Sequence, residues 1–447
     1  MSRDALQDPD LHRRRRQRLL DELGDGLLLL PTAAETLRNG DVHHEFRPGS
    51  DFQYLTGFPE PEAILAAWRT AKGRHRAILF VRPRDPAREI WDGKRHGLIG
   101  AKKAFGVDEA REFGAFWRDL PELLAAHDRL FHRLGAYANF DRRLLDCCKG
   151  VAFRHRRRQP PQHPTITDPG PAIAGQRARK DAQELAGLRA AAAATAAGHV
   201  AAMREATPGM HEYEVQAVLE AEFRRHGSPR NGYPSIVASG ANACVLHYHE
   251  NDRLMRRGDL LLIDAGAEVG GLTADVTRTF PISGRFSPAQ AAVYRAVLRA
   301  QLAGIRACKV GATWDAAHRT CIRWLTKGLV ELGVLHGRID ALIAKGAFRP
   351  WYMHGTTHWL GRDVHDVGAY EDARGRAERL RAGEVLTVEP GLYFGRRDRK
   401  VPAELRGIGV RIEDDILITA AGPEVLTAAV PKSVREVEAA CQSASPF

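Results

Sequence analysis

Carboxylate residues recur at the ends of strand-like runs in the C-terminal half of the chain, and this pattern limits the possible folds more than any other feature. Asp264 closes an apolar run of four residues, and Glu389 and Glu413 hold similar positions in two later runs. Such runs form β-strands, whose successive side chains point to opposite faces. The pattern therefore predicts a sheet in which carboxylates lie beside a buried apolar face.

A turn separates Asp264 from another candidate carboxylate, Asp275. Gly270-Gly271 lies between them, and two glycines at this position are typical of a β-hairpin turn. In such a hairpin we expect Asp264 and Asp275 to lie nearly opposite each other, with Cβ atoms about 4.5–5.5 Å apart. Facing carboxylates in a half-buried sheet repel each other unless a cation lies between them. Two surface aspartates that flank a turn are the alternative interpretation.

The alternation of side chains along the two later runs gives a further expectation. Glu389 falls on the face opposite Leu386 and Val388, whereas Arg411 and Glu413 share one face. A single carboxylate on a strand is usually solvated. Two carboxylates that each end an apolar strand indicate a shared site.

Three histidines lie within twelve residues, among glycines and a tryptophan: His354, His358 and His365. Any one of them is compatible with an ordinary core or surface position. Beside four carboxylates they suggest a metal site, because two divalent cations balance four negative charges and an imidazole adds a neutral ligand. Carboxylate oxygens with one nitrogen suit hard or borderline ions such as manganese. Two such ions in one site are typical of the catalytic centre of a peptidase or another amidohydrolase.

Composition excludes several classes of protein. With 447 residues, 44% hydrophobic and 27% charged, the chain is long and apolar enough for two or three folded domains. No apolar run approaches the roughly 18 residues that a membrane span needs. The net charge of +11 has two explanations. A generally arginine-rich composition is the stronger one, and binding of nucleic acid is the weaker one. Six cysteines without a C-x-x-C pair argue against a zinc ribbon, and the N-terminus lacks a secretory signal, so we expect a cytoplasmic protein.

Two domains are expected: an α/β domain at 1–172 and a larger α+β domain at 173–447. Five prolines and an arginine run at 154–171 mark the boundary as a linker. In the first domain, a helix at 10–23 ends at Gly24, and we expect its arginines to form a solvated face. The other elements predicted there are strands at 27–30, 63–68 and 77–81, and helices at 108–117 and 121–134.

The second domain is expected to pack helices on a mainly antiparallel sheet. Ser287, Pro288 and Gln290 form a strong helix-start signal, with Ser287 at the N-cap. The other predicted elements are helices at 181–205, 212–226 and 314–332, and strands at 260–264, 274–280, 385–389 and 409–419.

Five of these residues resemble, in chain order, the metal-ligand pattern of the pita-bread metallopeptidase family: Asp264, Asp275, His358, Glu389 and Glu413. That family includes aminopeptidase P, prolidase, methionine aminopeptidase and creatinase. Creatinase lacks the metal ligands, and methionine aminopeptidase normally lacks the first domain. The sequence is most similar to bacterial aminopeptidase P, or Xaa-Pro aminopeptidase, over nearly the whole chain. The matching segments are 50–63, 240–248, 354–366 and 407–414.

The resemblance implies a role for each ligand. Asp264 and Asp275 would bind metal ions, and Asp275 and Glu413 would bridge both of them. His358 would bind one ion. Glu389 would bind metal and act as the general base for the attacking water.

It also implies roles for residues around the metal ions. His247 and His365 would line the substrate site, with His365 donating to the peptide carbonyl or the oxyanion. His354 would line the pocket for proline. Arg411 would orient the cluster or hold a substrate carboxylate. Two further candidates support the site: Tyr393 beside Arg411, and Thr277 on the face of Asp275.

The implied activity is the release of the N-terminal residue from peptides with proline in the second position. Two manganese ions and a homodimer or homotetramer would accompany it. Prolidase, which cuts only dipeptides, has the same ligands and is the nearest alternative, and a non-catalytic pita-bread module that binds proteins or nucleic acid is a more distant one. The sequence departs from the family at Arg362, at Asp92 and Lys94 near a possible oligomer contact, and in the basic loop 395–400.

Overall fold

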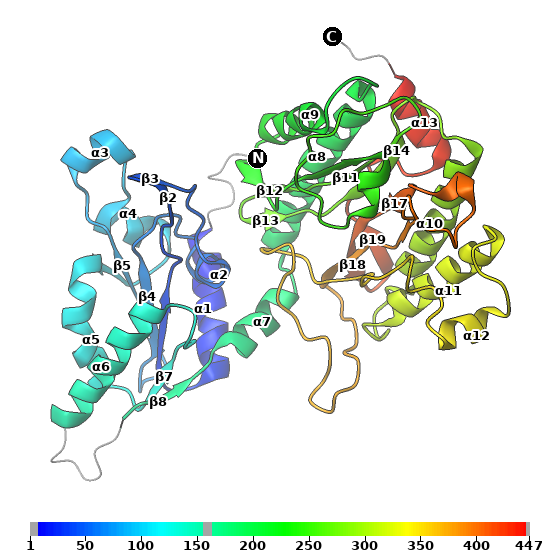
Figure 1. Ribbon diagram of the computed structural model, residues 1–447. Helices are drawn as coiled ribbons and strands as arrows, with labels where there is room; N and C mark the ends of the chain where they lie inside the picture. The colour runs from blue at the N-terminus through cyan, green and yellow to red at the C-terminus, as the bar shows by residue number, and fades with distance from the viewer. Residues whose placement is uncertain (1–7, 155–162, 444–447) are drawn as a thin grey trace. The chain divides into compact units, whose positions relative to one another are not determined.

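The protein's structure is a computed structural model, and it describes residues 8–154 and 163–443 (Figure 1). The chain divides into two compact units, with the division between Arg177 and Ala178. The boundary expected after residue 172 falls inside helix α7 (Gly170–Ala178), five residues before this division.

Six strands of the N-terminal unit form one mixed sheet in the order β6-β5-β4-β1-β7-β8. The pairs β1–β4 and β4–β5 are antiparallel, and the other pairs are parallel. The strands are β1 (Leu27–Pro31), β4 (Ile64–Arg69), β5 (His75–Val81), β6 (Glu109–Glu112), β7 (Arg129–Phe131) and β8 (Thr165–Thr167), with a separate ladder of β2 (Leu37–Asn39) and β3 (Val42–His43). The helices are α1 (Pro9–Leu23), α2 (Ser50–Thr56), α3 (Pro86–Asp92), α4 (Gly97–Ala104), α5 (Phe116–Ala125), α6 (Ala138–Arg154) and α7.

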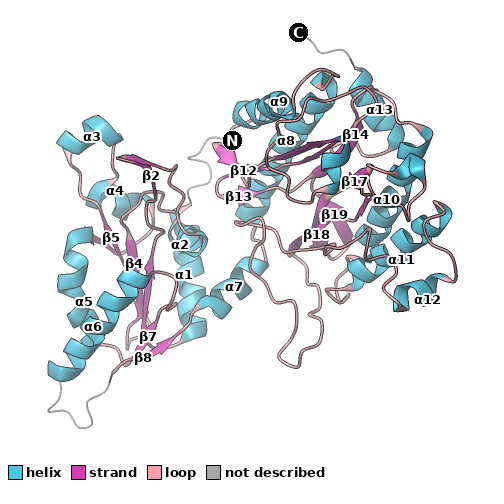
Figure 2. Ribbon diagram, in the orientation of Figure 1, coloured by secondary structure: helices cyan, strands magenta, loops and turns pink. Residues whose placement is uncertain are grey.

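Both faces of this sheet are apolar and covered by helices. Leu19 and Leu20 of α1 pack on one face, and Phe116, Leu120 and Leu144 of α5 and α6 pack on the other (Figure 2). Burial of each such side chain contributes about 1.5–3 kcal/mol. A sheet covered on both faces explains why its strands appear in the sequence as continuous apolar runs.

Some expectations for this unit are confirmed and others are wrong. The three early strands lie where the apolar runs predicted them. The stretch expected as a helix at 108–117 instead contains edge strand β6 and a short 3-10 turn, and the helix expected at 121–134 ends at Ala125, before β7. The tertiary pairing of β6 with β5 and of β7 with β1 overrides the local helix preference. Of the expected linker, residues 155–162 lie outside the described residues, and the rest contributes β8 and the start of α7.

The arginines of α1 are only partly solvated, contrary to expectation. Arg15 and Arg16 are 1% and 2% exposed, because consecutive residues point to different sides of a helix. Their guanidinium groups donate to the carbonyls of Tyr54 (3.1 Å) and Leu55 (2.7 Å) in the last turn of α2. A helix C-terminus leaves such carbonyls without partners and attracts cations, so these two arginines have a structural role.

The C-terminal unit has the expected α+β composition, with helices packed on small antiparallel sheets (Figure 1). Its sheets are β10-β11-β14, β13-β12-β9, β15-β18-β19 and β16-β17. The helices are α8 (Ala182–Glu205), α9 (Glu212–Arg225), α10 (Pro288–Ala307), α11 (Ala316–Glu331), α12 (Ile339–Ala344) and α13 (Val434–Gln442). The strands are β9 (Arg230–Asn231), β10 (Ile236–Ser239), β11 (Leu260–Asp264), β12 (Ala267–Val269), β13 (Leu272–Thr273), β14 (Thr277–Pro281), β15 (Val385–Val388), β16 (Gly391–Tyr393), β17 (Gly409–Arg411), β18 (Asp414–Thr419) and β19 (Gly422–Val425).

The helix predictions for this unit are confirmed to within two residues. The helix-start signal at Ser287 forms the expected capping box, in which Ser287 Oγ accepts from the Gln290 N–H at 3.2 Å. The run at 409–419 forms two strands instead of one. They are β17, which pairs with β16, and β18, which pairs with β15, so the chain passes from one sheet to another at Ile412 and Glu413.

The register expected around Gly270-Gly271 is wrong by two residues. Both glycines have positive φ values, 62° and 77°, and connect β12 to β13 as a tight turn. A hairpin centred between them places Asp264 opposite Thr277, as the ladder of β11 and β14 shows. Asp275 instead lies in the irregular stretch between β13 and β14.

Candidate metal centre and active site

A cavity of about 260 Å³ in the C-terminal unit is lined by nine of the eleven residues that the sequence analysis singled out for the site. They are Asp264, Asp275, His358, Glu389, Glu413, His247, His354, His365 and Arg411. The cavity lies where strands β11 and β15 end and where the chain passes from β17 in one sheet to β18 in another. Its lining also includes residues that the sequence did not indicate: Tyr233, Pro234, Ile236, Leu246, His249 and Val364.

Strand ends and backbone hydrogen bonds position the acidic residues. Asp264 ends β11, Glu389 follows β15, and Glu413 lies at the junction between β17 and β18. The backbone N–H of Asp275 donates to both carboxylate oxygens of Asp415, at 3.2 and 3.1 Å. Asp264, Glu389 and Glu413 thus converge because each one sits where a strand ends, and Asp275 is brought to them by its backbone hydrogen bonds to Asp415.

His358 is fixed with one ring nitrogen directed toward the carboxylates. Its backbone accepts from the Thr387 N–H at 3.0 Å, which ties it to β15. Its Nδ1–H donates to the Trp359 carbonyl at 3.0 Å, so Nε2 is the nitrogen that faces Asp275 Oδ2, at 3.2 Å. Nε2 also lies 3.9 Å from Glu389 and 4.0 Å from Glu413.

Tyr233 connects the two aspartates. Its hydroxyl lies 2.7 Å from Asp264 Oδ1 and 2.5 Å from Asp275 Oδ1. Burial, followed by the negative charges of both aspartates, raises the pKa of Tyr233 well above its usual value, so the phenol keeps its proton. No periodicity or motif in the sequence pointed to this loop residue.

Arg411 organises the opposite side of the cluster. Its guanidinium donates to Asp264 Oδ2 at 2.6 Å and to Thr277 Oγ1 at 3.0 Å. Thr277 in turn donates to Glu413 Oε2 at 2.6 Å. The expectation that Arg411 and Glu413 share a face agrees with this geometry, since both reach the same threonine hydroxyl.

A second chain of hydrogen bonds leads from Arg411 to His354. Arg411 donates to the Tyr393 hydroxyl at 3.2 Å, and that hydroxyl lies 2.8 Å from His354 Nε2. The Nδ1–H of His354 donates to the Gly355 carbonyl at 2.7 Å, so Nε2 accepts from Tyr393. Burial, then the charge of Arg411, lowers the pKa of His354 to about 4, which leaves the imidazole neutral.

The carboxylates carry more negative charge than their surroundings balance. Burial, then the neighbouring carboxylates, raises the pKa of Glu413 well above its usual value. Burial likewise raises the pKa of Glu389, to about 8, although His358 and Arg411 oppose the shift. Burial alone lowers the pKa of His358, but its hydrogen bond to Asp275 and the charges of Asp275 and Glu389 raise it to about 9.

This donor set fits divalent metal ions. One ligand atom from each of Asp275, His358 and Glu413 lies within 4.8 Å of the other two. The imidazole is held in the tautomer that leaves Nε2 free, and without a metal that nitrogen holds a proton against Asp275. Mainly carboxylate oxygens with one imidazole nitrogen suit hard or borderline ions. A cation in this position would replace the proton and relieve the repulsion among the acids.

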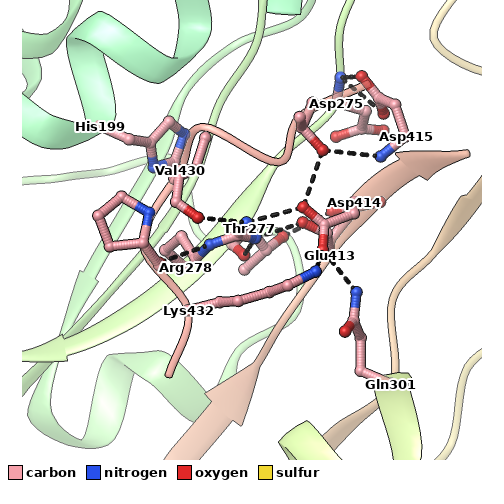
Figure 3. Close-up of polar contacts among 12 residues, drawn as sticks. His199, Asp275, Thr277, Arg278, Gln301, Glu413, Asp414, Asp415, Val430 and Lys432 are labelled. Carbon is pink, nitrogen blue, oxygen red and sulfur yellow. Dashed lines mark hydrogen bonds and ion pairs between the residues drawn. The ribbon is translucent and has the colours of Figure 1, made fainter. Parts of the chain in front are cut away.

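Behind the cluster lies a second group of polar and charged side chains, which we call the Arg278 hub. Figure 3 labels Arg278, Asp414, Gln301 and Lys432, and Thr427 completes the group through its hydrogen bond to Asp414. The fully buried Arg278 donates to Asp414 Oδ1 at 2.7 Å and to the carbonyls of Thr277, Glu413, Val430 and Pro431. Asp414 also accepts from Thr427 and Gln301, at 2.8 and 2.7 Å, and from Lys432 at 2.6 Å. The hub therefore fixes the backbone of the strands that present Thr277 and Glu413 to the cavity.

The remaining histidines lie around the cluster. The ring of His365 is 4.5 Å from that of His358, at an interplanar angle of 79°. His247 and His249 are exposed and nearly parallel, with ring centroids 6.4 Å apart. Burial, then the charge of His358, lowers the pKa of His365.

The positions where the sequence departs from the family are not among the residues that line the cavity. Arg362 is buried and forms an ion pair with Glu184, 3.1 Å away. Asp92 and Lys94 lie at the end of α3 and just after it, beside the exposed Trp91. In the basic loop 395–400, Asp398 accepts from Trp351 Nε1 at 2.9 Å, which anchors the loop.

Sequence and structure comparisons relate the chain to known proteins. Residues 186–420 match the model of metallopeptidase family M24, and residues 12–131 match the aminopeptidase P N-terminal domain. The Xaa-Pro aminopeptidase of Escherichia coli (strain K12) is 43% identical over 427 residues, which cover 95% of this chain and 96% of that protein.

Two solved structures have the same fold over almost the whole chain. One is the Pseudomonas aeruginosa aminopeptidase PepP, with a TM-score of 0.93, 44% identity and coverage of 97% of this chain and 98% of that one. The other is a variant of Escherichia coli aminopeptidase P in complex with substrate, with the same TM-score and coverage and 41% identity.

Proposed function

Because the chain belongs to metallopeptidase family M24, we propose that it is a metal-dependent exopeptidase that releases the N-terminal residue from peptides with proline in the second position. The observation that carries this proposal is the convergence of four carboxylates and one imidazole at a single cavity. The likeness to an Xaa-Pro aminopeptidase over 95% of the chain supplies the proline preference.

Two divalent metal ions would be held by Asp264, Asp275, His358, Glu389 and Glu413. Asp275, His358 and Glu413 offer ligand atoms within 4.8 Å of one another, which supports their assignment to this centre. Manganese suits this oxygen-rich set. When bound, such ions polarise the scissile carbonyl and lower the pKa of the attacking water.

Glu389 is positioned to move the proton of the attacking water. Its carboxylate lines the cavity, and burial raises its pKa to about 8 in the metal-free protein. A carboxylate beside the attacking water can accept its proton and return it to the leaving nitrogen of proline.

Three histidines line the cavity in which the scissile bond would lie. His365 donates a hydrogen bond to the carbonyl oxygen, where negative charge develops in the transition state. His354, held by Tyr393, lines the pocket for the proline ring, and His247 contacts the substrate from the loop after β10. Arg411 keeps Asp264 oriented through their 2.6 Å contact.

The test is to follow cleavage of Arg-Pro-Pro and Ala-Pro by mass spectrometry, with added manganese and with a chelator. We expect release of arginine from the tripeptide with manganese, and no release with the chelator. Cleavage of Ala-Pro alone would identify a prolidase. No cleavage of either peptide by the manganese-loaded protein would support a non-catalytic module and refute the proposal.

The Glu389→Gln variant separates the general base from metal binding. We expect it to lose turnover by roughly 10²–10⁴-fold, while metal content changes much less. Full activity in this variant would contradict the assignment of Glu389.

Assembly and location complete the proposal. We expect a homo-oligomer, since Ile90, Trp91 and Ile99 are 82%, 84% and 87% exposed and would be covered by another subunit. Sedimentation analysis checks this. The six cysteines are free, which agrees with a cytoplasmic location. Within the described ranges, none of the helices combines the length and apolar character that crossing a bilayer requires.

A further inference from the structure

Two buried ion pairs connect the start of α8 to the segment 361–366, which carries His365. Arg362 Nε lies 3.1 Å from Glu184 Oε1, with side chains 6% and 2% exposed. Lys180 Nζ lies 2.7 Å from Asp366 Oδ2, with side chains 2% and 1% exposed. One pair thus lies three residues before His365 and the other directly after it. We call these four residues the α8 clamp.

The segment held by the clamp lies outside the sheets. Its backbone is held by irregular hydrogen bonds: Gly361 accepts from the Thr273 N–H at 2.9 Å and donates to the Asp363 carbonyl at 3.2 Å, and the Asp366 N–H donates to the Trp359 carbonyl at 2.9 Å. His365 itself is exposed to the cavity. Ordering of its imidazole therefore depends on side chains that anchor the segment on either side.

His358 provides an internal contrast. Its ring centroid is 4.5 Å from that of His365, yet its backbone is tied to β15 by the Thr387 N–H at 3.0 Å and by Thr387 Oγ1 at 3.2 Å. The two imidazoles are neighbours in space but are supported by different parts of the fold. A change in the clamp should move one and leave the other in place.

Stability alone does not account for two ion pairs at this depth. Apolar residues of similar volume often stabilise a protein as well as a buried ion pair or better, because the charges lose their hydration. An ion pair is directional, however, and the planar guanidinium of arginine fixes the geometry of its partner. The clamp suits a segment that must hold one conformation.

We propose that Lys180, Glu184, Arg362 and Asp366 are positioning residues for His365, and that they hold its imidazole toward the scissile carbonyl. This inference rests on the proposed peptidase function. Displacement of a catalytic group by about 1 Å can reduce turnover by roughly 10²-fold, so loss of one pair should act mainly on kcat.

The test is a double-mutant cycle between Arg362→Met and His365→Ala, with kcat and KM measured for Arg-Pro-Pro. We expect Arg362→Met to lower kcat at least about tenfold, with a much smaller change in KM. In the His365→Ala background the same substitution should change kcat by less than about twofold, because the group that it positions is already absent. Equal losses in both backgrounds would overturn the inference.

Two further variants separate positioning from stability. The double variant Glu184→Met with Arg362→Met removes both charges of one pair, so no carboxylate of that pair is left buried without its arginine. Its kcat should still be lower than that of the wild-type protein. Arg189→Met is the matched control on the same helix, since Arg189 forms an exposed pair with Glu424 at 2.9 Å. We expect wild-type kcat from Arg189→Met. Wild-type kcat from the double variant would contradict the proposal.

A spectroscopic measurement tests the clamp without turnover. In NMR spectra of the metal-free protein labelled with ¹³C at histidine Cε1, Arg362→Met should shift or broaden the His365 signal, which the His365→Ala variant identifies. The His358 signal should change much less. An unchanged His365 signal would refute the clamp. If the wild-type protein cleaved no peptide, the proposed function would fail, and this spectrum would still decide whether the clamp holds His365.

Discussion

Glu413 and Asp414 are consecutive residues with almost fully buried side chains, 1% and 0% exposed, yet they belong to groups of opposite character. Glu413 faces the cavity among other carboxylates, and burial together with their charges raises its pKa well above the usual value. Asp414 faces the Arg278 hub. Burial would raise its pKa too, but the charges of Arg278 and Lys432 lower it below the usual value.

The difference teaches how to distinguish a structural charge group from one that awaits a ligand. In the hub, Asp414 accepts hydrogen bonds from four side chains, two of them cationic, and the guanidinium of Arg278 is surrounded by acceptors. In the cavity, four carboxylates face a lining whose one permanent cation, among the described residues, is Arg411. The first group is complete within the protein. The second becomes balanced only when cations bind.

The largest effect on the free energy of unfolding is expected from Asp414→Asn, which removes the carboxylate at the centre of the Arg278 hub. The substitution keeps the shape of the side chain but leaves Arg278 and Lys432 without their carboxylate. Removal of one partner from a buried ion pair typically costs about 3–5 kcal/mol. Urea unfolding of the metal-free protein should show this loss, and an unchanged midpoint would mean that the hub is not the support described above.

A smaller effect is expected at the acid cluster in the cavity, which lacks balancing cations in the metal-free protein. A change of pH should alter the stability of that protein. The pKa of Glu389 rises from its ordinary 4.5 to about 8, and that of His358 rises from 6.5 to about 9, so the native state binds more protons than the unfolded state between these values. Stability of the metal-free protein should therefore fall as pH increases from 4.5 to 9, since the native state loses protons that the unfolded state has already released.

Thermal unfolding at several pH values measures this trend. Saturation with manganese should flatten it, because the bound ions replace the protons. An equally steep trend with and without metal would show that these carboxylates are not the titrating groups.

Removal of one charge from the cluster should stabilise the metal-free protein while it removes a metal ligand. Glu413→Gln keeps an acceptor for the Thr277 hydroxyl and removes a carboxylate whose ionisation is disfavoured. At pH 8 we expect a gain of roughly 1–2 kcal/mol, opposite in sign to the effect of Asp414→Asn. Metal analysis should show reduced occupancy. Destabilisation of both variants would remove the distinction between the two groups.

The smallest effect is expected at the edge of the hub. Lys432 is 19% exposed at its side chain and lies 2.6 Å from Asp414, which keeps three other donors. Lys432→Met should therefore cost about 1 kcal/mol and leave metal content unchanged. A loss as large as that of Asp414→Asn would mean that Lys432, not Arg278, balances the carboxylate.

The sequence predicted which residues meet at the cavity better than it predicted the strand register around them. Strand ends indicated where Asp264, Glu389 and Glu413 would lie, because an apolar run that stops at a carboxylate marks the edge of a buried sheet. The spacing misplaced Asp275 by two residues, because a hairpin centred between Gly270 and Gly271 pairs Asp264 with Thr277. The chemical roles of these residues stay predictions until the variants are measured.

Other features had no signal that local reasoning could use. Tyr233 bridges two aspartates from a loop without periodicity. Arg278 has an unremarkable place in a strand pattern, and its partners lie as far away as Pro431, so only the tertiary fold shows that it is buried. The buried arginines of α1 were missed for the same reason, because the α2 carbonyls that they bind lie 39 residues away.

The segment from Thr427 to Lys432 has a consequence for synthesis of the protein. These residues supply acceptors and donors to the hub, and the hub holds the backbone behind Glu413. A ribosome-bound chain that has not yet released this segment lacks the support for its acid cluster. The last ligand of the cluster, Glu413, therefore gains its full support only when residues 427–432 have joined the fold.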